Sequence, residues 1–257
     1  MVLLRDRDAG GGPPEVLMLQ RHAEDKFAAG AYVFPGGMLE SIDYGPRALA
    51  LSPLGAREAG EALPDVSPAE KALGFFIAAI RETFEEAGIL LARTPEGTRW
   101  HPTPRELPAV REARRALHAG RLDFVDWVRG MGLRLATDEF QYFAHWITPA
   151  VRPIRFDARF FAVEVGPDVT AEADLREVQA PIWVTPGEAL ERFQRKEVNL
   201  LGATRANLSL LARYPSTREA LAALRERTVE AILPKLRNNP DGSVTPVFPW
   251  DAQYQTL

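Results

Sequence analysis

The sequence predicts an α/β fold, because short strand-like runs alternate along the chain with amphipathic segments of helical period. Its 257 residues are enough for one domain with a full hydrophobic core. Hydrophobic residues make up 46% of the chain and charged residues 26%, which is ordinary for a globular protein. We expect one domain over residues 1–235 and an extended C-terminal tail over residues 236–257.

The chain begins with two short apolar runs, residues 2–7 and 16–21, which are separated by a loop rich in glycine and proline. This pattern predicts a hairpin-like pair of strands. Further strands are expected where β-branched and aromatic residues gather, at residues 89–92, 143–148, 155–165 and 182–184. Helical spacing predicts helices at residues 104–119, 122–131, 187–196, 203–212 and 217–228.

The strongest helix signal lies at residues 67–88. Ser67 followed by Pro68 and Glu70 predicts a capping box, and Gly88 is suited to the left-handed position after the last turn. An apolar stripe on this helix predicts the face that packs in the core; it consists of Leu73, Phe76, Ile77, Ile80, Phe84 and Ala87.

The opposite side of the helix carries Glu82, Glu85 and Glu86 within about 100° of one another. Such a face can simply be solvated. However, like charges at this spacing destabilise a helix by a few tenths of a kcal/mol unless a cation neutralises them. Mg²⁺ takes carboxylate oxygens as ligands and keeps waters for substrate phosphates. The cluster therefore favours a metal-dependent site.

Two stretches read as additions to this framework. Residues 38–66 are broken by glycine and proline around a short helical piece at residues 56–62. We expect this segment to lie over a substrate cleft or to contribute to a homodimer contact. The second stretch, residues 103–131, is predicted to hold two helices whose polar residues are solvated and to act as a specificity or cover element.

Composition excludes several classes of function. A formal net charge of −4 gives no support for nucleic-acid binding, which needs a basic field. The absence of cysteine excludes disulfides and thiolate metal sites. Apolar runs are too short to span a membrane, and the first eight residues lack the layout of a signal peptide, so we expect a cytoplasmic protein.

The glutamate helix and the glycines before it resemble the Nudix hydrolases. The signature of that family runs glycine, five residues, glutamate, seven residues, Arg-Glu, two residues, Glu-Glu, one residue and glycine. Residues 81–89 reproduce its closing part and Gly37 its opening glycine, but about thirty extra residues lie between Gly37 and Arg81. The resemblance implies a Nudix-type α/β/α sandwich with a mixed sheet and helical insertions, with residues 38–66 inserted within the motif.

The resemblance also implies the site. Glu82, Glu85, Glu86 and the carbonyl of Gly37 are expected to bind Mg²⁺ or Mn²⁺. Glu82, Glu85 and Arg81 are expected to be catalytic, with Arg81 orienting Glu85 and with Glu82 or a loop carboxylate as general base.

Two further positions stay open. Counting back from Arg81 puts Leu73 where the first glutamate of the motif belongs, so Glu70 and Glu40 are the candidate replacements. An additional carboxylate is expected from the acidic loop at residues 168–177: Glu177 is the first candidate, and Glu172 and Asp174 compete with it; a catalytic role for the strand histidine His145 is the less favoured reading.

An insertion within the motif is typical of the subgroup that contains acyl-coenzyme A diphosphatases. The spacing of residues 17–37 resembles the coenzyme A signature of certain members, and Arg21, Lys26 and Gly36 are the implied substrate-binding residues. Arg21 and Lys26 can instead be two solvated cations. The implied reaction cleaves coenzyme A or its thioesters to 3′,5′-ADP and phosphopantetheine. The alternatives are another small-molecule nucleoside diphosphate, such as ADP-ribose or NADH, a nucleoside polyphosphate, and a sensor that binds a nucleotide without cleaving it.

Overall fold

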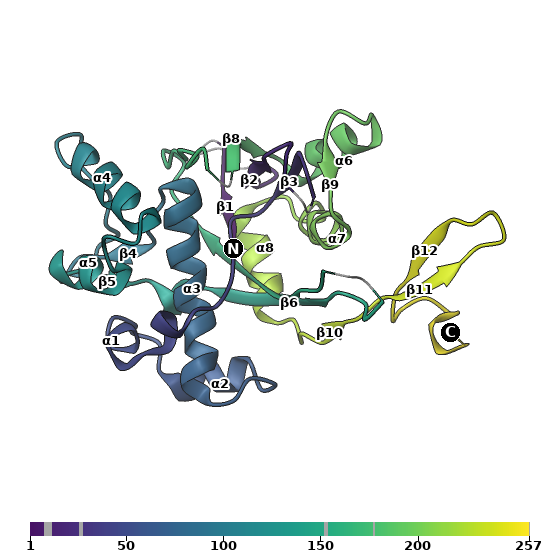
Figure 1. The fold of residues 1–257 in the computed structure, drawn as a ribbon, viewed down its shortest axis with the longest axis horizontal. Helices are drawn as coiled ribbons and strands as arrows, with labels where there is room; N and C mark the ends of the chain where they lie inside the picture. The colour runs from purple at the N-terminus through teal and green to yellow at the C-terminus, as the bar shows by residue number, and fades with distance from the viewer. Residues whose placement is uncertain (8–11, 26–27, 152–153, 177, 257) are drawn as a thin grey trace.

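The computed structural model describes residues 1–7, 12–25, 28–151, 154–176 and 178–256. An eight-stranded sheet forms its centre, in the order β10-β6-β7-β1-β2-β3-β9 with β8 paired to β2 (Figure 1). The strands are β1 (Val2–Arg5), β2 (Glu15–Arg21), β3 (Ala31–Val33), β6 (Gln141–Ile147), β7 (Asp157–Glu164), β8 (Val178–Val184), β9 (Asn199–Leu200) and β10 (Ala231–Ile232).

The sheet is mixed. Strands β1 and β2 form the predicted antiparallel pair, whereas β1 runs parallel to β7 and β3 runs parallel to β9. Successive side chains of a strand point to opposite faces. In β1, Leu3 therefore joins one hydrophobic core while Val2 and Leu4 join another, and all three are fully buried.

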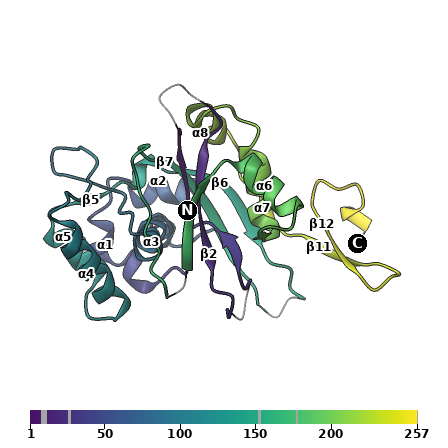
Figure 2. The same cartoon turned by 90° about the horizontal axis from the view of Figure 1, so that it is seen from above.

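Helices cover both faces of the sheet, as Figure 2 shows from above. Helix α3 (Ala69–Ala87) contributes to the first core, and the second core is covered by α6 (Pro186–Gln194), α7 (Gly202–Leu211) and α8 (Thr217–Arg225). This arrangement confirms the predicted α/β/α sandwich with a mixed sheet.

Helix α3 has the predicted apolar stripe, all of it buried. Gly88 ends the helix in the left-handed conformation at φ 71°, and its N–H donates to the carbonyl of Phe84 at 2.9 Å. The predicted capping box at Ser67 is absent: the N-cap is Pro68, and no side chain caps the helix. Because the helix starts one residue later than predicted, Ser67 lies outside the N-cap position.

Both added stretches pack around α3. Residues 38–66 contain η1 (Ser41–Tyr44), α1 (Pro46–Leu49) and the expected short helix α2 (Ala56–Ala62). The second stretch forms α4 (Leu107–His118) and α5 (Phe124–Gly130), and a small two-stranded sheet, β4 (Ala92–Arg93) with β5 (Arg134–Leu135), adjoins it. The rings of Phe84 and Trp127 stack at a centroid distance of 4.7 Å, which joins α5 to α3.

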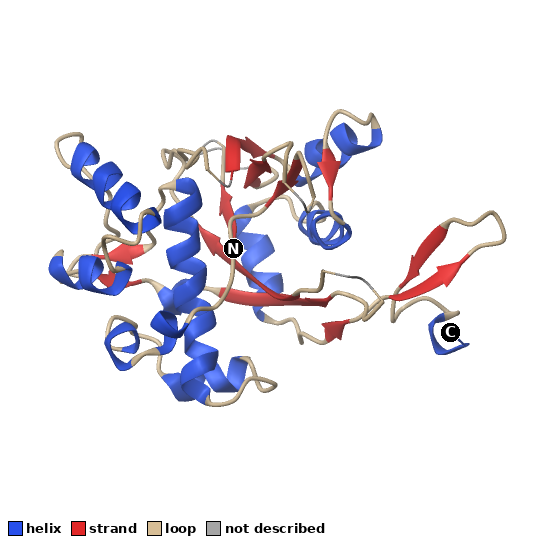
Figure 3. Cartoon of the chain, in the orientation of Figure 1, coloured by secondary structure: helices blue, strands red, loops and turns tan. Residues whose placement is uncertain are grey.

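The C-terminal residues extend away from the body of the molecule (Figure 3). The expected tail contains a hairpin of β11 (Lys235–Asn238) and β12 (Val244–Val247), followed by the turn η3 (Tyr254–Thr256). Phe248 stacks on Trp250 and meets Trp146 edge to face at 6.0 Å, which attaches the end of β12 to the sheet. The domain boundary at residue 235 stays a prediction.

Replacing Phe84 with alanine tests whether the aromatic contact under α5 stabilises the fold. Phe84 is fully buried, so Phe84→Ala should lower the free energy of unfolding by about 3–5 kcal/mol through lost contacts and a cavity. Urea denaturation followed by fluorescence measures this change. The control Val244→Ala removes a side chain that is 46% exposed and should change it by no more than about 0.5 kcal/mol. Equal effects would contradict the packing described here.

Candidate active site

The glycine loop, which contains Gly36 and Gly37, lies against the face of α3 that carries the glutamates. The Gly36 N–H donates to Glu86 Oε2 at 2.8 Å. A Cβ atom at Gly37 would lie 2.5 Å from the carboxylate atoms of Glu82, closer than real Cβ contacts allow. A side chain at position 37 would therefore have to displace the Glu82 carboxylate, and glycine avoids this. Glu82 and Glu86 are 9% and 5% exposed, so this face of α3 is covered rather than solvated.

Arg81 connects the parts of the site. Its Nε and Nη2 donate to the two carboxylate oxygens of Asp43 at 2.8 and 3.0 Å, in the bidentate geometry that makes arginine–carboxylate pairs strong. Its Nη1 donates to Glu82 Oε1 at 2.9 Å and to Glu85 Oε2 at 3.3 Å. Nη2 also donates to the carbonyl of Met38 at 2.9 Å. Arg81 thus contacts both Glu85 and Glu82, and its role in orienting Glu85 for catalysis stays a prediction.

The charges of this cluster influence one another. Burial raises the pKa of Glu85; Arg81 opposes the rise, and the nearby negative charges of Glu40 and Asp43 add to it. Burial lowers the pKa of Arg81, but the hydrogen bonds that it donates to Asp43 and the charges of Glu82, Asp43 and Glu85 outweigh this effect and raise the pKa overall. Arg81 therefore stays protonated throughout the pH range in which the protein is folded.

Asp43 is the site residue that our sequence reasoning missed. It is fully buried, on η1 inside the inserted stretch, and its Oδ2 also accepts the Glu40 N–H at 2.8 Å. Counting forward from Gly37 would have found it, since five residues separate Gly37 from Asp43, the spacing of the first acidic position of the motif. Counting backward from Arg81 failed because about thirty extra residues follow Asp43.

The two proposed replacements for that glutamate have different positions. Glu70 is exposed in the first turn of α3, about 18 Å along the helix axis from Glu82 at 1.5 Å per residue. Glu40 is exposed too, but it lies beside the cluster, where its charge acts on Glu85. Neither takes the place at Arg81 that Asp43 occupies.

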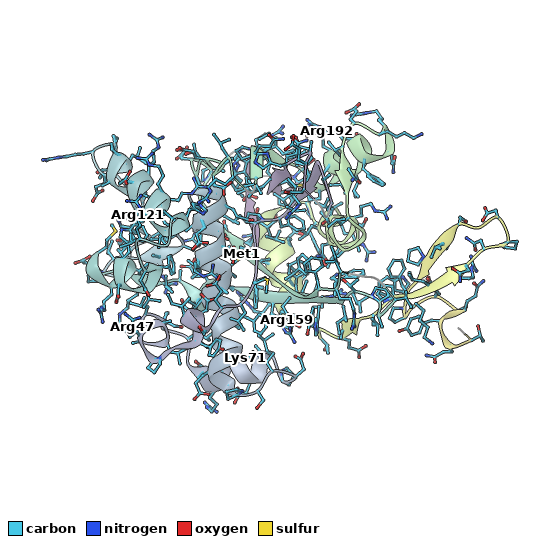
Figure 4. The ribbon with its side chains drawn as sticks, in the orientation of Figure 1. Met1, Arg47, Lys71, Arg121, Arg159 and Arg192 are labelled. Atoms are coloured by element: carbon cyan, nitrogen blue, oxygen red, sulfur yellow. The ribbon has the colours of Figure 1, made fainter. Side chains whose placement is uncertain are left out.

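An open hollow of about 500 Å³ adjoins this cluster, between α3 and the helical insert. Glu85, Arg81 and Glu40 line one side of it, and His118 and Arg121 line the other. Arg121 extends beside α4, on the side of α3 away from the C-terminal hairpin (Figure 4). The His118 ring nitrogen Nε2 lies 3.0 Å from the carbonyl of Glu85. The insert therefore forms a wall of the site and carries two basic side chains, His118 and Arg121, that the sequence reasoning did not single out.

A second residue of the insert, Arg114, corrects the expectation that its polar side chains are solvated. Arg114 is only 7% exposed, and its Nε donates to the carbonyl of Glu85 at 2.7 Å. The carbonyls in the last turn of a helix have no hydrogen-bond donor within the helix, and Arg114 is the donor for the carbonyl of Glu85. The amphipathic pattern of α4 could not reveal this contact, because it depends on how α4 packs on α3.

The three predicted substrate-binding residues are Arg21, Lys26 and Gly36, and the two that the structure describes do not lie together. Gly36 lies beside Glu86, next to the ion cluster of Arg81. Arg21 ends β2 and forms an ion pair with Asp25 at 3.0 Å, and it is absent from the linings of the hollow and of the cavity described below. Lys26 lies outside the described residues. Phosphate binding by Arg21 and Lys26 stays a prediction.

The acidic loop approaches the last turn of α3. Glu177 lies outside the described residues. Glu172 pairs with Arg111 at the surface, whereas the side chain of Asp174 is buried, with Oδ2 3.8 Å from His118 Nε2. His145, the alternative catalytic histidine, is bonded through Nε2 to Asp157 on the neighbouring strand at 2.5 Å, in a contact between strands.

The donor set of the glutamate face suits a hard divalent cation, because carboxylate oxygens in a covered site are the ligands that Mg²⁺ and Mn²⁺ prefer. Gly37 lies so close to Glu82 that the backbone at this glycine and the carboxylate are direct neighbours. Within the described residues, no three acidic or histidine side chains converge on one point. Metal ligation by Glu82, Glu85, Glu86 and Gly37 stays a prediction.

Exchanging Asp43 for asparagine tests its place at Arg81. Asp43→Asn leaves part of a buried positive charge uncompensated and should cost at least about 2 kcal/mol of stability. For a chain of this size the melting temperature should fall by roughly 4–8 °C. Thermal unfolding followed by circular dichroism measures it. Glu70→Gln, at an exposed position, should leave the melting temperature within about 1 °C. A larger effect at Glu70 than at Asp43 would refute the assignment.

Comparison with known proteins places this geometry in a family. Residues 13–205 match the family model described as NUDT19 Nudix domain. The acyl-coenzyme A diphosphatases NUDT19 of Gallus gallus and Homo sapiens are 32% and 28% identical to the chain, and each match covers 93% of this chain and 72% of the relative. A crystal structure of a NUDIX hydrolase from Alicyclobacillus acidocaldarius superposes with a TM-score of 0.66 at 26% identity, covering 86% of this chain and 92% of that one. The chain belongs to the NUDT19 Nudix domain family, which confirms the predicted hydrolase.

Proposed function

We propose that this protein cleaves the diphosphate bond of coenzyme A or acyl-coenzyme A, giving 3′,5′-ADP and phosphopantetheine or its acyl form. One observation carries the proposal: Arg81 and Glu85 face a hollow whose opposite wall carries His118 and Arg121. A diphosphate diester carries two negative charges, so it needs cations around it, and the carboxylates of the site would hold a divalent cation for it. The names of the relatives support the choice of coenzyme A over other diphosphates.

In this proposal, hydrogen bonds within the protein hold the carboxylates of the site in place. Arg81 holds Glu82 and Glu85, and the Gly36 N–H holds Glu86, so that the carboxylates are oriented before substrate arrives. When bound, Mg²⁺ or Mn²⁺ supplies positive charge that neutralises the diphosphate and eases deprotonation of a water.

Other parts of the site bind substrate and move the proton. Arg121, exposed at the rim of the hollow, is placed to bind a phosphate oxygen. Glu82, or the loop carboxylate Glu177, serves as general base in this proposal.

Partners and compartment follow from the same proposal. The substrate is a small nucleoside diphosphate, and nucleic acid is not among the expected partners. None of the helices in the described ranges is long and apolar enough to cross a membrane. Assembly as a homodimer and a cytoplasmic location stay predictions.

A hydrolysis screen with product identification by mass spectrometry tests the proposal. Wild-type protein with Mg²⁺ or Mn²⁺ should release 3′,5′-ADP from coenzyme A, and chelation should stop the reaction. The double variant Glu85→Gln, Glu86→Gln removes two carboxylates and should lose at least about 100-fold in kcat/KM, the effect typical of lost electrostatic stabilisation.

The matched control is Glu58→Gln, Glu61→Gln, which removes the same number of charges from exposed positions of α2. Full activity of the Glu85, Glu86 variant would sink the proposal. Preferred cleavage of ADP-ribose or NADH would move the assignment to another diphosphate, and tight binding without any cleavage would indicate a sensor.

A further inference from the structure

A second cavity lies beyond the end of α3. Its volume is about 280 Å³, and its walls come from the chain after Gly88, the first turns of α4 and the acidic loop. Most of the lining is apolar; it includes Ile89, Leu91, Trp100, Leu107, Val110 and Val169. Pockets for whole small molecules span about 300–1,000 Å³, so this cavity has room for only part of a substrate as large as coenzyme A.

The polar groups at this cavity are mostly satisfied by one another. Arg99 pairs with Glu139, and Arg111 pairs with Glu172. Arg114 is different: its Nη1 donates to the carbonyl of Glu172 at 2.7 Å, but its buried Nη2 has no hydrogen-bond partner within the described part of the chain. An unsatisfied buried donor costs about 1–3 kcal/mol. Nη2 is itself fully shielded, so the cavity offers a ligand chiefly its apolar lining.

This cavity adjoins the catalytic helix. Arg114 lines the cavity, and its Nε binds the carbonyl of Glu85, whose side chain faces the hollow. Helix α4 runs between the two spaces, since His118 lines the hollow and Leu107 lines the cavity. These positions are eleven residues apart, or roughly 16 Å along the helix at 1.5 Å per residue. The hollow and the cavity therefore lie along one helix, at a separation that a long flexible substrate could span.

We propose that this cavity binds the acyl end of an acyl-coenzyme A substrate, with the hydrocarbon chain against the apolar walls. The inference rests on the proposed function and adds to it a selection for acyl chains of short to medium length. Because the cations Arg99 and Arg111 at this cavity are paired with carboxylates, a neutral hydrocarbon chain suits the site better than a further phosphate.

Filling the cavity tests this assignment. Val169 is half-buried and lines it, so Val169→Phe should occupy the space of the chain. The kcat/KM for octanoyl-coenzyme A, divided by that for coenzyme A, should fall about tenfold, the effect of losing a few methylenes of apolar contact. Leu107→Trp, at a second half-buried lining position, should lower the same ratio and guards against a folding defect in the first variant. The control Val66→Phe makes the same exchange at a half-buried position outside the cavity lining and should keep the ratio within about twofold.

Two further measurements separate the outcomes. If the wild type cleaves neither substrate, the proposed function fails, and calorimetry still tests the cavity: octanoyl-coenzyme A should bind more tightly than coenzyme A, and Val169→Phe should abolish the difference. Free octanoate should raise KM for octanoyl-coenzyme A without changing KM for coenzyme A. An unchanged ratio in both lining variants, or equal inhibition of both substrates by octanoate, would overturn the proposal in favour of an empty cavity or a separate fatty-acid site.

Discussion

The buried ion cluster around Arg81 is the interaction on which the rest of the site depends. A guanidinium that is only 5% exposed would be very costly without partners, and here it has a bidentate carboxylate and two glutamates of its own helix. Asp43 comes from the middle of the inserted stretch, and Met38 is the residue that directly follows Gly37. One side chain therefore fixes the loop, the insertion and the helix relative to one another.

This cluster explains why the helix can be covered on almost every side. The apolar stripe of α3 packs on the sheet, and the ions of the opposite face compensate one another beneath η1 and α4. The helical insert then completes the surroundings: His118 and Arg114 both contact the carbonyl of Glu85. Because α4 separates the hollow from the apolar cavity, one element can influence both the charged and the hydrophobic part of a substrate.

Individual strands and helices could be predicted from the sequence, because their signals come from neighbouring residues. The apolar run that begins with Val2, Leu3 and Leu4 predicted a strand, and the stripe that ends at Ala87, followed by Gly88, predicted the long helix and its left-handed cap. Their signals lie within a few neighbouring residues, where side-chain period and backbone preference act directly.

Contacts between residues far apart in the sequence could not be predicted. Asp43 reaches Arg81 across 38 positions of sequence, and its spacing to Gly37 is meaningful only once the insertion is known to follow it. Arg114 reads as a solvated residue of an amphipathic helix, since its burial comes from the packing of α4 on α3. Propensity and period carry no information about such pairings, which depend on the assembled fold.

A double-mutant cycle between Asp43 and Arg81 tests the central claim most directly. The kcat/KM for coenzyme A would be measured for the wild type, Asp43→Asn, Arg81→Gln and the double variant. If Asp43 acts through Arg81, each single change loses most of the activity and the double variant loses little more, giving a coupling energy of at least about 2 kcal/mol. Strictly additive losses, with coupling below about 0.5 kcal/mol, would show that the two residues act independently and would contradict the account.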